Sequence, residues 1–532
     1  MFILVTRITG SVGPSRLIFG LMFLACGCLL GPDYHRPPAR VAANWQEASE
    51  PVVNSNRSKY RDWWNVFNDP VLSRLIKIAY EQNLTLRTAG VHVLEARAQL
   101  GIAIGELYPQ QQQLTSSVSY NRIPITNTVV LANTFWSAAF AAQTTWELDV
   151  WGKLRRGVES ADDAFLASVA NYDDVLVSLT GDVAATYVQI RTTQKQIAIA
   201  HDSVVKQRMA VKIAQARYKG GAATKLDVYQ ATNVLGSTEA AVLQLTIQLE
   251  QSKNALSVLL GMEPGRLDAL LAGASEIPNA PAAVAVGIPA ELLRRRPDIR
   301  KAELEAAAQC AQIGIAKADL FLTFSLFGAV GTLSSDVGRS TLGDIFTSSS
   351  LAFTVGPSLQ WNILNYGQIT NNVRVQDASF QALLVDYQNT VLKAQQDVEN
   401  GIALFTQSRS EVVFLTKSVR AAEGALQIAT FKYKEGTVDF TVVLLAEQNL
   451  YAAQNSLALA QGMVPLGVIA TYRAMGGGWQ IREGHNFVPA STRDEMAKRT
   501  NWGQLLTPQL LKPQALELPS PSDTGPLIRL PE

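Results

Sequence analysis

Apolar residues recur at steps of three and four over a very long stretch of the first half of the chain. After Trp151-Gly152 these positions are Tyr172, Val175, Leu176, Leu179, Val183, Tyr187, Ile190 and Ile197. This spacing places them on one face of an α-helix. The pattern ends at Tyr218-Lys219-Gly220-Gly221, where paired glycines favour a sharp reversal. We therefore predict one helix of about 67 residues from Gly152 to Tyr218, roughly 100 Å long, and a helix that returns from the turn.

The same stretch occurs a second time, 215 residues later, without gaps. The matched positions include tryptophans, tyrosines and glycines, which chance similarity between alanine-rich helices does not explain. They include Trp146/Trp361, Gly152/Gly367, Tyr172/Tyr387, Tyr218/Tyr433, Lys219/Lys434 and Gly221/Gly436. The sequence therefore predicts an internal duplication, with two equivalent structural units side by side.

Each half also holds two segments in which apolar and polar residues alternate. In the first half these are Leu114–Tyr120 and the run from Phe135 to Trp146, and in the second Leu322–Leu326 and Phe353–Trp361. This period predicts two β-hairpins, one per repeat. Alternating strands with aromatic ends fit a transmembrane β-barrel, and a soluble two-hairpin sheet is the alternative.

Four strands from one chain cannot close a barrel, and an open edge within lipid leaves backbone groups without partners. If these are membrane strands, several chains must contribute to one barrel by cyclic symmetry. Two, three or four copies would give about 8, 12 or 16 strands, and the sequence does not choose among them. Because the long helices follow the strands directly, the predicted product is a membrane pore continued by a tube of helices.

Composition and charge offer no support for nucleic-acid binding or catalysis. Among 532 residues, 46 Lys and Arg nearly balance 45 Asp and Glu, for a net charge of +1. The four histidines are scattered singly, and the three cysteines form no pattern typical of a metal site or a nucleophile. The run Arg294-Arg295-Arg296 is interpreted as structural. We therefore expect neither an enzyme nor a cofactor.

The first 27 residues have the features of a lipoprotein signal peptide. Arg7 and Arg16 precede a short apolar run, which ends at Cys26-Gly27-Cys28. We expect lipidation at Cys28, by a thioether-linked diacylglycerol and an N-acyl chain such as palmitate, in preference to Cys26. Plain secretion is the alternative. The expected segments are 1–27 signal peptide, 28–70 Pro-rich extended segment, 71–277 first repeat, 278–296 linker, 297–475 second repeat and 476–532 irregular tail.

Several local motifs together carry a family resemblance over about residues 28–479. They are Cys28–Tyr34 with Arg36-Pro37, Trp151-Gly152, Gly287-Ile288-Pro289, Arg295–Arg300, the two Tyr-Lys-x-Gly turns and Tyr472–Trp479. With these motifs the chain resembles the TolC-like outer-membrane factors of Gram-negative tripartite efflux systems, and within them the NodT-type lipoprotein branch.

The resemblance implies a fold, a location and partners. It implies a homotrimer in the outer-membrane lipid, whose 12-stranded transmembrane β-barrel takes about four strands from each chain, continued by a long periplasmic α-helical barrel. The implied partners are a periplasmic adaptor (membrane-fusion) protein and an inner-membrane proton-driven transporter. The channel would pass small compounds without a cofactor. The alternatives are the outer-membrane component of a type I polypeptide secretion system, and a periplasm-spanning scaffold that is not a channel.

The resemblance also implies that the helical tube closes near the two turns. Carried over by position, the tip and gate candidates are Tyr218, Gly221, Asp227, Tyr433, Gly436, Asp439, Thr441, Leu445 and Glu447. The second half departs from the family pattern, because Leu445-Ala446-Glu447-Gln448 stands where the family often has Asp-Ala-Gln-Arg. Three copies of Leu445 would form an apolar constriction in place of an acidic ring.

Overall fold

The computed structural model describes residues 29–42, 44–46, 53–54, 60–123, 133–265, 267–273, 276–286, 295–338 and 340–507. The chain divides into two compact units. Unit 1 consists of Met1–Pro37, Glu95–Ala167 and Ala302–Tyr387, and unit 2 of Pro38–Leu94, Ser168–Lys301 and Gln388–Glu532. Each unit therefore contains matching elements from both copies of the duplicated sequence.

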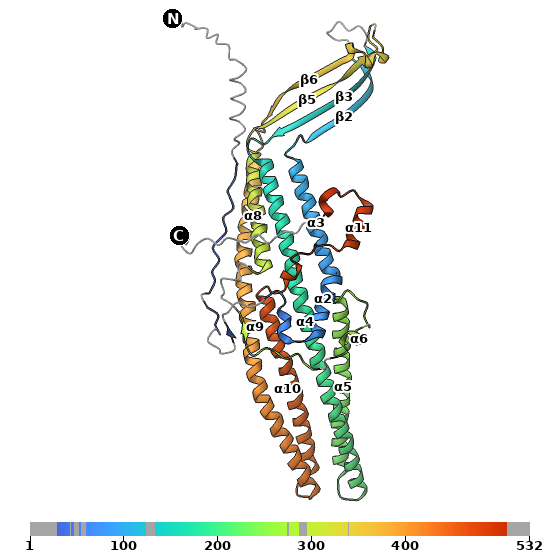
Figure 1. The fold of residues 1–532 in the computed structure, drawn as a ribbon, viewed down its shortest axis with the longest axis vertical. Coiled ribbons are helices and arrows are strands. Elements are labelled where there is room, and N and C mark those ends of the chain that lie inside the picture. The colour runs from blue at the N-terminus through green and yellow to red at the C-terminus, as the bar shows by residue number, and fades with distance from the viewer. Residues whose placement is uncertain are drawn as a thin grey trace. The chain divides into compact units, whose positions relative to one another are not determined.

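The duplication is visible in the helix boundaries (Figure 1). Helices α4 (Lys153–Lys219) and α9 (Gln368–Lys434) have 67 residues each, and α5 (Lys225–Leu259) and α10 (Phe440–Ala474) have 35 each. Each boundary in the second pair lies 215 residues after its counterpart. Helices α3 (Leu84–Gly105) and α8 (Pro297–Ala318) match in the same way, with 22 residues each. The predicted duplication and the predicted long helices are confirmed.

The described helices are amphipathic or mixed in character along their length. None of those that the structure describes is both long enough and apolar enough to cross a bilayer.

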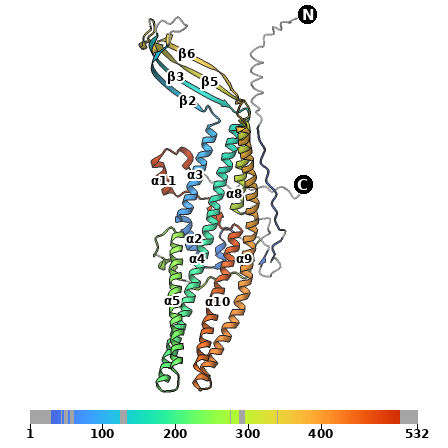
Figure 2. The ribbon, with the colours of Figure 1, turned by 180° about the vertical axis from the view of Figure 1, so that it is seen from behind.

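Unit 1 contains one four-stranded antiparallel sheet, seen from two sides in Figures 1 and 2. The strands are β2 (Gln111–Arg122), β3 (Thr134–Leu148), β5 (Thr323–Ser335) and β6 (Leu351–Gln360), in that order across the sheet. The two predicted hairpins join through β3 and β5, with Gln143 opposite Ala329. Within the described residues β2 and β6 each pair on one side only, so both edges carry unpaired backbone groups.

The sheet leaves large apolar side chains uncovered. On β2, Leu114 and Val118 are 69% and 64% exposed, and on β6, Phe353 and Val355 are 77% and 78% exposed. These residues stem from the alternating pattern that predicted the strands. An apolar surface of this size is typical of a face that meets lipid or another protein chain.

The core of unit 2 is aromatic at its centre. The 3-10 helix Trp63–Phe67 buries Trp63, whose indole stacks on the ring of Tyr472 with centroids 5.7 Å apart. Helix α2 (Pro70–Gln82) follows, and its N-cap Asp69 accepts hydrogen bonds from the backbone of Val71 and from the hydroxyl of Tyr187 at 2.8 and 2.7 Å. The aromatic cluster at the start of the first repeat is therefore a packing feature.

Two smaller features complete unit 2. Strands β1 (Val53–Asn54) and β4 (Val284–Ala285) pair in parallel, and α6 (Asp268–Leu271) follows α5. Residues 479–507, where the sequence predicts an irregular tail, contain helix α11 (Ala490–Arg499), which lies beside α3 in Figures 1 and 2. Val488 and Met496 pack there against Leu94 of α3. The apolar contacts of this segment are few and widely spaced, so they produce no visible period in the sequence. Residues 508–532 lie outside the described residues.

Candidate functional site at the helix turns

The turn between α4 and α5 is built from local hydrogen bonds. Gly221 adopts a φ of 73°, which favours glycine, and its N–H donates to Tyr218 O at 3.0 Å. Helix α5 then starts behind the N-cap Thr224. The carboxylate of Asp227 accepts from the Thr224 N–H at 2.7 Å, and the Asp227 N–H donates to the Thr224 hydroxyl at 3.3 Å. This reciprocal capping box gives Asp227 a structural partner within its own turn.

The turn between α9 and α10 repeats the reversal but not the cap. Gly436 has a φ of 77°, and its N–H donates to Tyr433 O at 3.0 Å. Asp439 stands at the N-cap of α10, but its side chain accepts no capping hydrogen bond. The carboxylate of Asp439 is exposed. The two turns therefore share a backbone path and differ in the chemistry of their second helix start.

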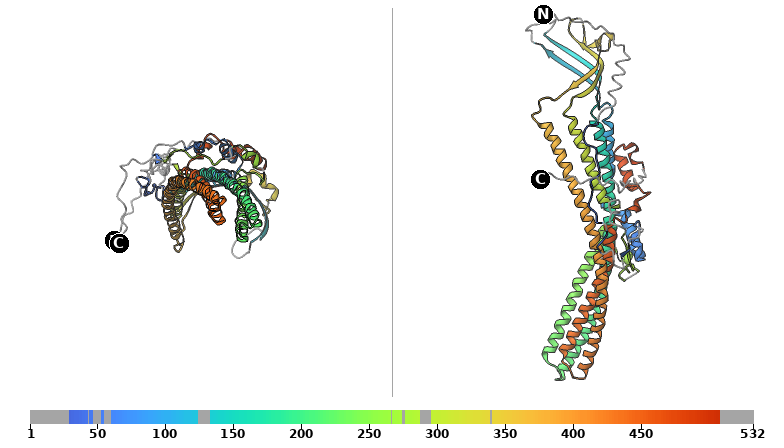
Figure 3. Two further views of the ribbon diagram at one scale, coloured as in Figure 1. Left: turned by 90° about the horizontal axis from the view of Figure 1, so that it is seen from below. Right: turned by 90° about the vertical axis from the view of Figure 1, so that its left-hand side faces the viewer.

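The two helix hairpins pack against each other near the turns (Figure 3). Phe440 and Leu444 of α10 share one apolar cluster with Ala214 of α4, Ala231 of α5 and Ala429 of α9.

Polar contacts cross the same interface. The Arg217 guanidinium lies 4.3 Å from the centre of the Tyr433 ring, and the Thr441 hydroxyl donates to the Gln230 side chain at 3.2 Å. Of the predicted tip residues, the structure therefore brings Tyr433 and Thr441 into contact with the other hairpin. Tyr218 remains 45% exposed.

Leu445 and Glu447 lie on different sides of α10. Leu445 is 56% exposed, whereas Glu447 is half-buried. Two residues along a helix correspond to a rotation of about 200°, so both side chains cannot face the same space. One carboxylate oxygen of Glu447 is buried without a hydrogen-bond partner among the described residues. Burial raises the pKa of Glu447, and Lys206 opposes this shift.

The sequence did not single out Phe440, Arg217 or Gln230, which make the contacts between the hairpins. Phe440 and Arg217 flank the glycine turns, so their proximity to a turn was a readable signal. Gln230 carried none, because a glutamine on a long polar helix is ordinary.

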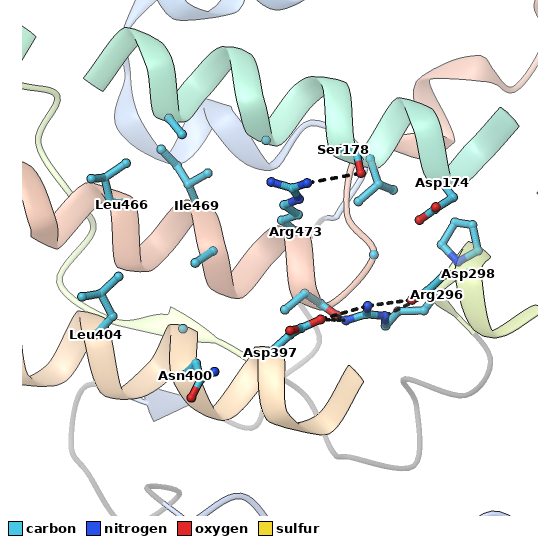
Figure 4. Close-up of a pocket in the computed structure, with 18 residues that line it drawn as sticks. Asp174, Ser178, Arg296, Asp298, Asp397, Asn400, Leu404, Leu466, Ile469 and Arg473 are labelled. Carbon is cyan, nitrogen blue, oxygen red and sulfur yellow. Dashed lines mark hydrogen bonds and ion pairs between the residues drawn. The ribbon is translucent and has the colours of Figure 1, made fainter. Parts of the chain in front are cut away.

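The arginine-rich stretch before α8 serves a helix junction. Arg296 donates to Ala474 O at the end of α10 at 2.8 Å, and it pairs with Asp298 at 2.7 Å and Asp397 at 3.2 Å (Figure 4). A cation suits the carbonyl end of α10, and Asp298 suits the first turn of α8. The structure therefore supports the interpretation of these arginines as structural.

A cavity of about 590 Å³ adjoins this junction within unit 2. Arg473 lines it and pairs with Asp182 at 2.7 Å, so both arginines of the cavity are matched by carboxylates (Figure 4). Asp174 projects from α4 into the same region, and its pKa is raised by burial and by the neighbouring Asp298. Among the described residues no group of three or more His, Cys, Asp or Glu is placed to hold a metal ion.

In unit 1 the first described residues form a strap on α4 and α8. Leu30 N donates to Trp151 O at 3.1 Å, and Arg156, whose side chain is 2% exposed, pairs with Asp33 at 2.7 Å. A Cβ on Gly31 would lie 2.5 Å from the Cα of Gly314, so the strap and the helix touch backbone to backbone. The expected lipidation site Cys28 lies outside the described residues and directly precedes this strap.

Comparison with known proteins gives consistent matches over most of the chain. The family model for outer membrane efflux proteins matches residues 75–262 and 288–477. Nodulation protein T of Rhizobium leguminosarum bv. trifolii is 29% identical over 438 residues, which cover 82% of this chain and 91% of that protein. The cation efflux system protein CusC of Escherichia coli is 28% identical over 472 residues, which cover 88% of this chain and 100% of that protein.

Solved structures agree with these matches. The outer-membrane channel OprN superposes with a TM-score of 0.78 at 31% identity, covering 85% of this chain and 100% of that one. A CusC structure superposes with a TM-score of 0.71 at 26% identity, covering 85% and 100%. These matches confirm the predicted fold class, a duplicated mixed α and β membrane protein with four strands per chain, and the resemblance to the NodT-type branch. The chain belongs to the outer membrane efflux protein family, and it is an outer-membrane channel protein, not an enzyme.

Proposed function

We propose that three copies of this chain form a passive exit duct, through which small compounds cross the outer membrane. The observation that carries the proposal is the four-stranded sheet of unit 1. Its edges β2 and β6 are unpaired within the described residues, and its apolar side chains are exposed. Three such sheets joined edge to edge make a barrel of about 12 strands, which removes every open edge and turns the apolar face toward lipid.

The helix turns of unit 2 are the proposed contact with a periplasmic adaptor protein. Both turns present a left-handed glycine and exposed polar residues, and the hairpins behind them pack through a shared apolar cluster. In this proposal an adaptor shifts the hairpins outward, and an inner-membrane proton-driven transporter delivers the substrate. Relatives named as cation efflux and efflux-pump components support this arrangement.

Leu445 and Glu447 are the proposed residues of the constriction. The exposed Leu445 side chain is available to meet its copies in neighbouring chains, which would form an apolar ring. Glu447 would act from the opposite side of α10, against the hairpin interface. Asp227 remains a weaker candidate, because its carboxylate already accepts hydrogen bonds within its own turn.

The lipid anchor at Cys28 is a further part of the proposal. The strap that follows holds its backbone to α4 and α8 through Leu30 and Asp33. A lipidated residue would therefore be attached to rigid helices by a very short connection.

Single-channel recording from the purified full-length protein in planar bilayers tests this function. We expect stable conductance from the parent, and a higher conductance from Leu445→Ser, because a smaller polar residue widens and wets an apolar ring. Glu447→Ala should also alter conductance. Leu459→Ser is the matched control, because Leu459 is an exposed leucine of α10 in a different part of the helix. Unchanged conductance in both test variants would exclude these residues from the constriction, and a parent that never conducts would contradict the channel itself.

A further inference from the structure

A second cavity in unit 2 has an unusual electrostatic character. It has a volume of about 870 Å³ and lies between α4, α9, α10 and the segment 276–282. The volume is within the range of about 300–1,000 Å³ that is typical of small-molecule sites. Three cationic side chains line it, namely Arg191, Lys195 and Arg409.

Arg191 is buried without a carboxylate partner. Its residue is 3% exposed, and its two terminal nitrogens donate to the neutral oxygens of Gln194 at 2.9 Å and Leu271 at 2.7 Å. Its Nε is buried with no hydrogen-bond partner among the described residues. The guanidinium also lies 5.0 Å from the centre of the Tyr187 ring, and the hydroxyl of that tyrosine donates to Asp69. The nearest link to a carboxylate therefore runs through a tyrosine.

Lys195 and Arg409 are also satisfied by neutral acceptors. Lys195 donates to the side-chain oxygen of Gln461 at 2.6 Å, and Arg409 donates to Ala282 O. Across the described residues no carboxylate lies within ion-pair distance of any of the three cations. Glu276 is the one acidic residue in the lining, and its side chain is exposed.

Buried cations are normally paired, because desolvation without a counter-ion is costly. Here three cations from two helices meet at one cavity, and the protein supplies amides and carbonyl oxygens in place of carboxylates. We propose that this cavity binds a small oxyanion that carries more than one carboxylate or phosphate group. The buried Nε of Arg191 and the flexible head of Lys195 supply charge-assisted hydrogen bonds, which are stronger than neutral ones.

The bound anion would join the segment 276–282 to the helices. Arg409 already contacts this segment at Ala282, and Lys195 and Arg191 contact α4, α10 and the end of α6. An anion that bridges these cations therefore adds a crosslink within unit 2 and stabilises the folded chain by mass action. This inference does not depend on conduction.

Isothermal titration of the full-length protein in detergent, with citrate and separately with pyrophosphate, tests the proposal. We expect the parent to bind at least one of the two oxyanions, more weakly as NaCl is raised, and not to bind neutral trimethyl citrate. The double variant Lys195→Gln/Arg409→Gln should weaken binding by roughly tenfold or more, the loss expected from about one charged hydrogen bond.

Lys212→Gln is the control, because it removes the same charge from an exposed position of α4 outside the cavity. It should bind as tightly as the parent. If the double variant does not elute as the parent does, Lys195→Gln alone replaces it, since Lys195 lies on the exposed surface of α4. Equal binding by parent and cavity variants, or no binding of either oxyanion by the parent, would overturn the proposal. A failure of conduction in bilayers would leave this result unaffected.

Discussion

Arg482 and Asp173 form a buried two-point ion pair within unit 2. Arg482 Nη2 lies 2.9 Å from one carboxylate oxygen of Asp173, and Nε donates to the other. The two side chains are 5% and 3% exposed. Burial raises the pKa of Asp173, and the adjoining Arg482 opposes this shift. The pair attaches the segment 479–507 to α4, so this segment is an integral part of unit 2.

We predict that Arg482→Gln destabilises the protein by about 3–5 kcal/mol, because it leaves a buried carboxylate without its partner. Thermal unfolding in detergent measures the effect, and limited proteolysis should cut within 479–507 sooner than in the parent. Arg499→Gln on the exposed face of α11 is the control and should change little. The double variant Asp173→Asn/Arg482→Gln should lose less than the sum of the two single variants. Strict additivity would show that the two side chains do not interact.

The two helix turns should respond differently to loss of their N-cap side chains. Thr224→Ala removes the capping box of α5 and should cost about 1 kcal/mol. Asp439→Ala should cost clearly less, since the Asp439 side chain accepts no capping bond. Hydrogen exchange of the amides at the start of α5 and of α10 measures both effects locally. Equal acceleration at the two turns would contradict the difference in capping.

Glu447 predicts a specific dependence of stability on pH. Because burial raises its pKa in the folded state, folding binds a proton more tightly than the unfolded chain does, and this stabilisation is lost as the pH rises through the raised value. Glu447→Gln should therefore raise the melting temperature at pH 7.5, and the gain should shrink as the pH falls toward the ordinary value of 4.5.

Glu435→Gln, which alters an exposed carboxylate in the same hairpin, is the control. It should show no such pH-dependent gain. A Glu447→Gln variant whose gain is the same at both ends of this pH range would contradict the role of burial.

The long-range architecture was predictable because it repeats. The Tyr-Lys-x-Gly motifs indicated both reversals, and the helix pairs on either side of them have equal lengths in the two copies. The alternation around Leu114 and Phe353 likewise indicated the strands. Periodic signals of this kind accumulate over many residues, so single exceptions do not hide them.

Isolated contacts were not predictable. Asp173 and Arg482 are separated by more than 300 residues, and nothing near either residue indicates its partner. The cations Arg191 and Arg409 likewise meet only because α4 and α9 pack together. The capping box of Thr224 and Asp227 is the exception, since it is a local motif that the sequence contains openly. Within the candidate site, the turns were predictable and the contacts between the hairpins were not.

The central claim is that β2 of one chain lies beside β6 of the next in a closed ring of three chains. Disulfide crosslinking in native membranes tests it, with Thr115→Cys in β2 combined in turn with Thr354→Cys, Gly356→Cys or Ser358→Cys in β6, so that neighbouring registers are covered. Each single-cysteine variant is a control and should remain uncrosslinked. The account predicts that at least one pair yields covalent species that end at three chains on a denaturing gel. No crosslink from any of the pairs, or a series that ends at a different number of chains, would contradict it.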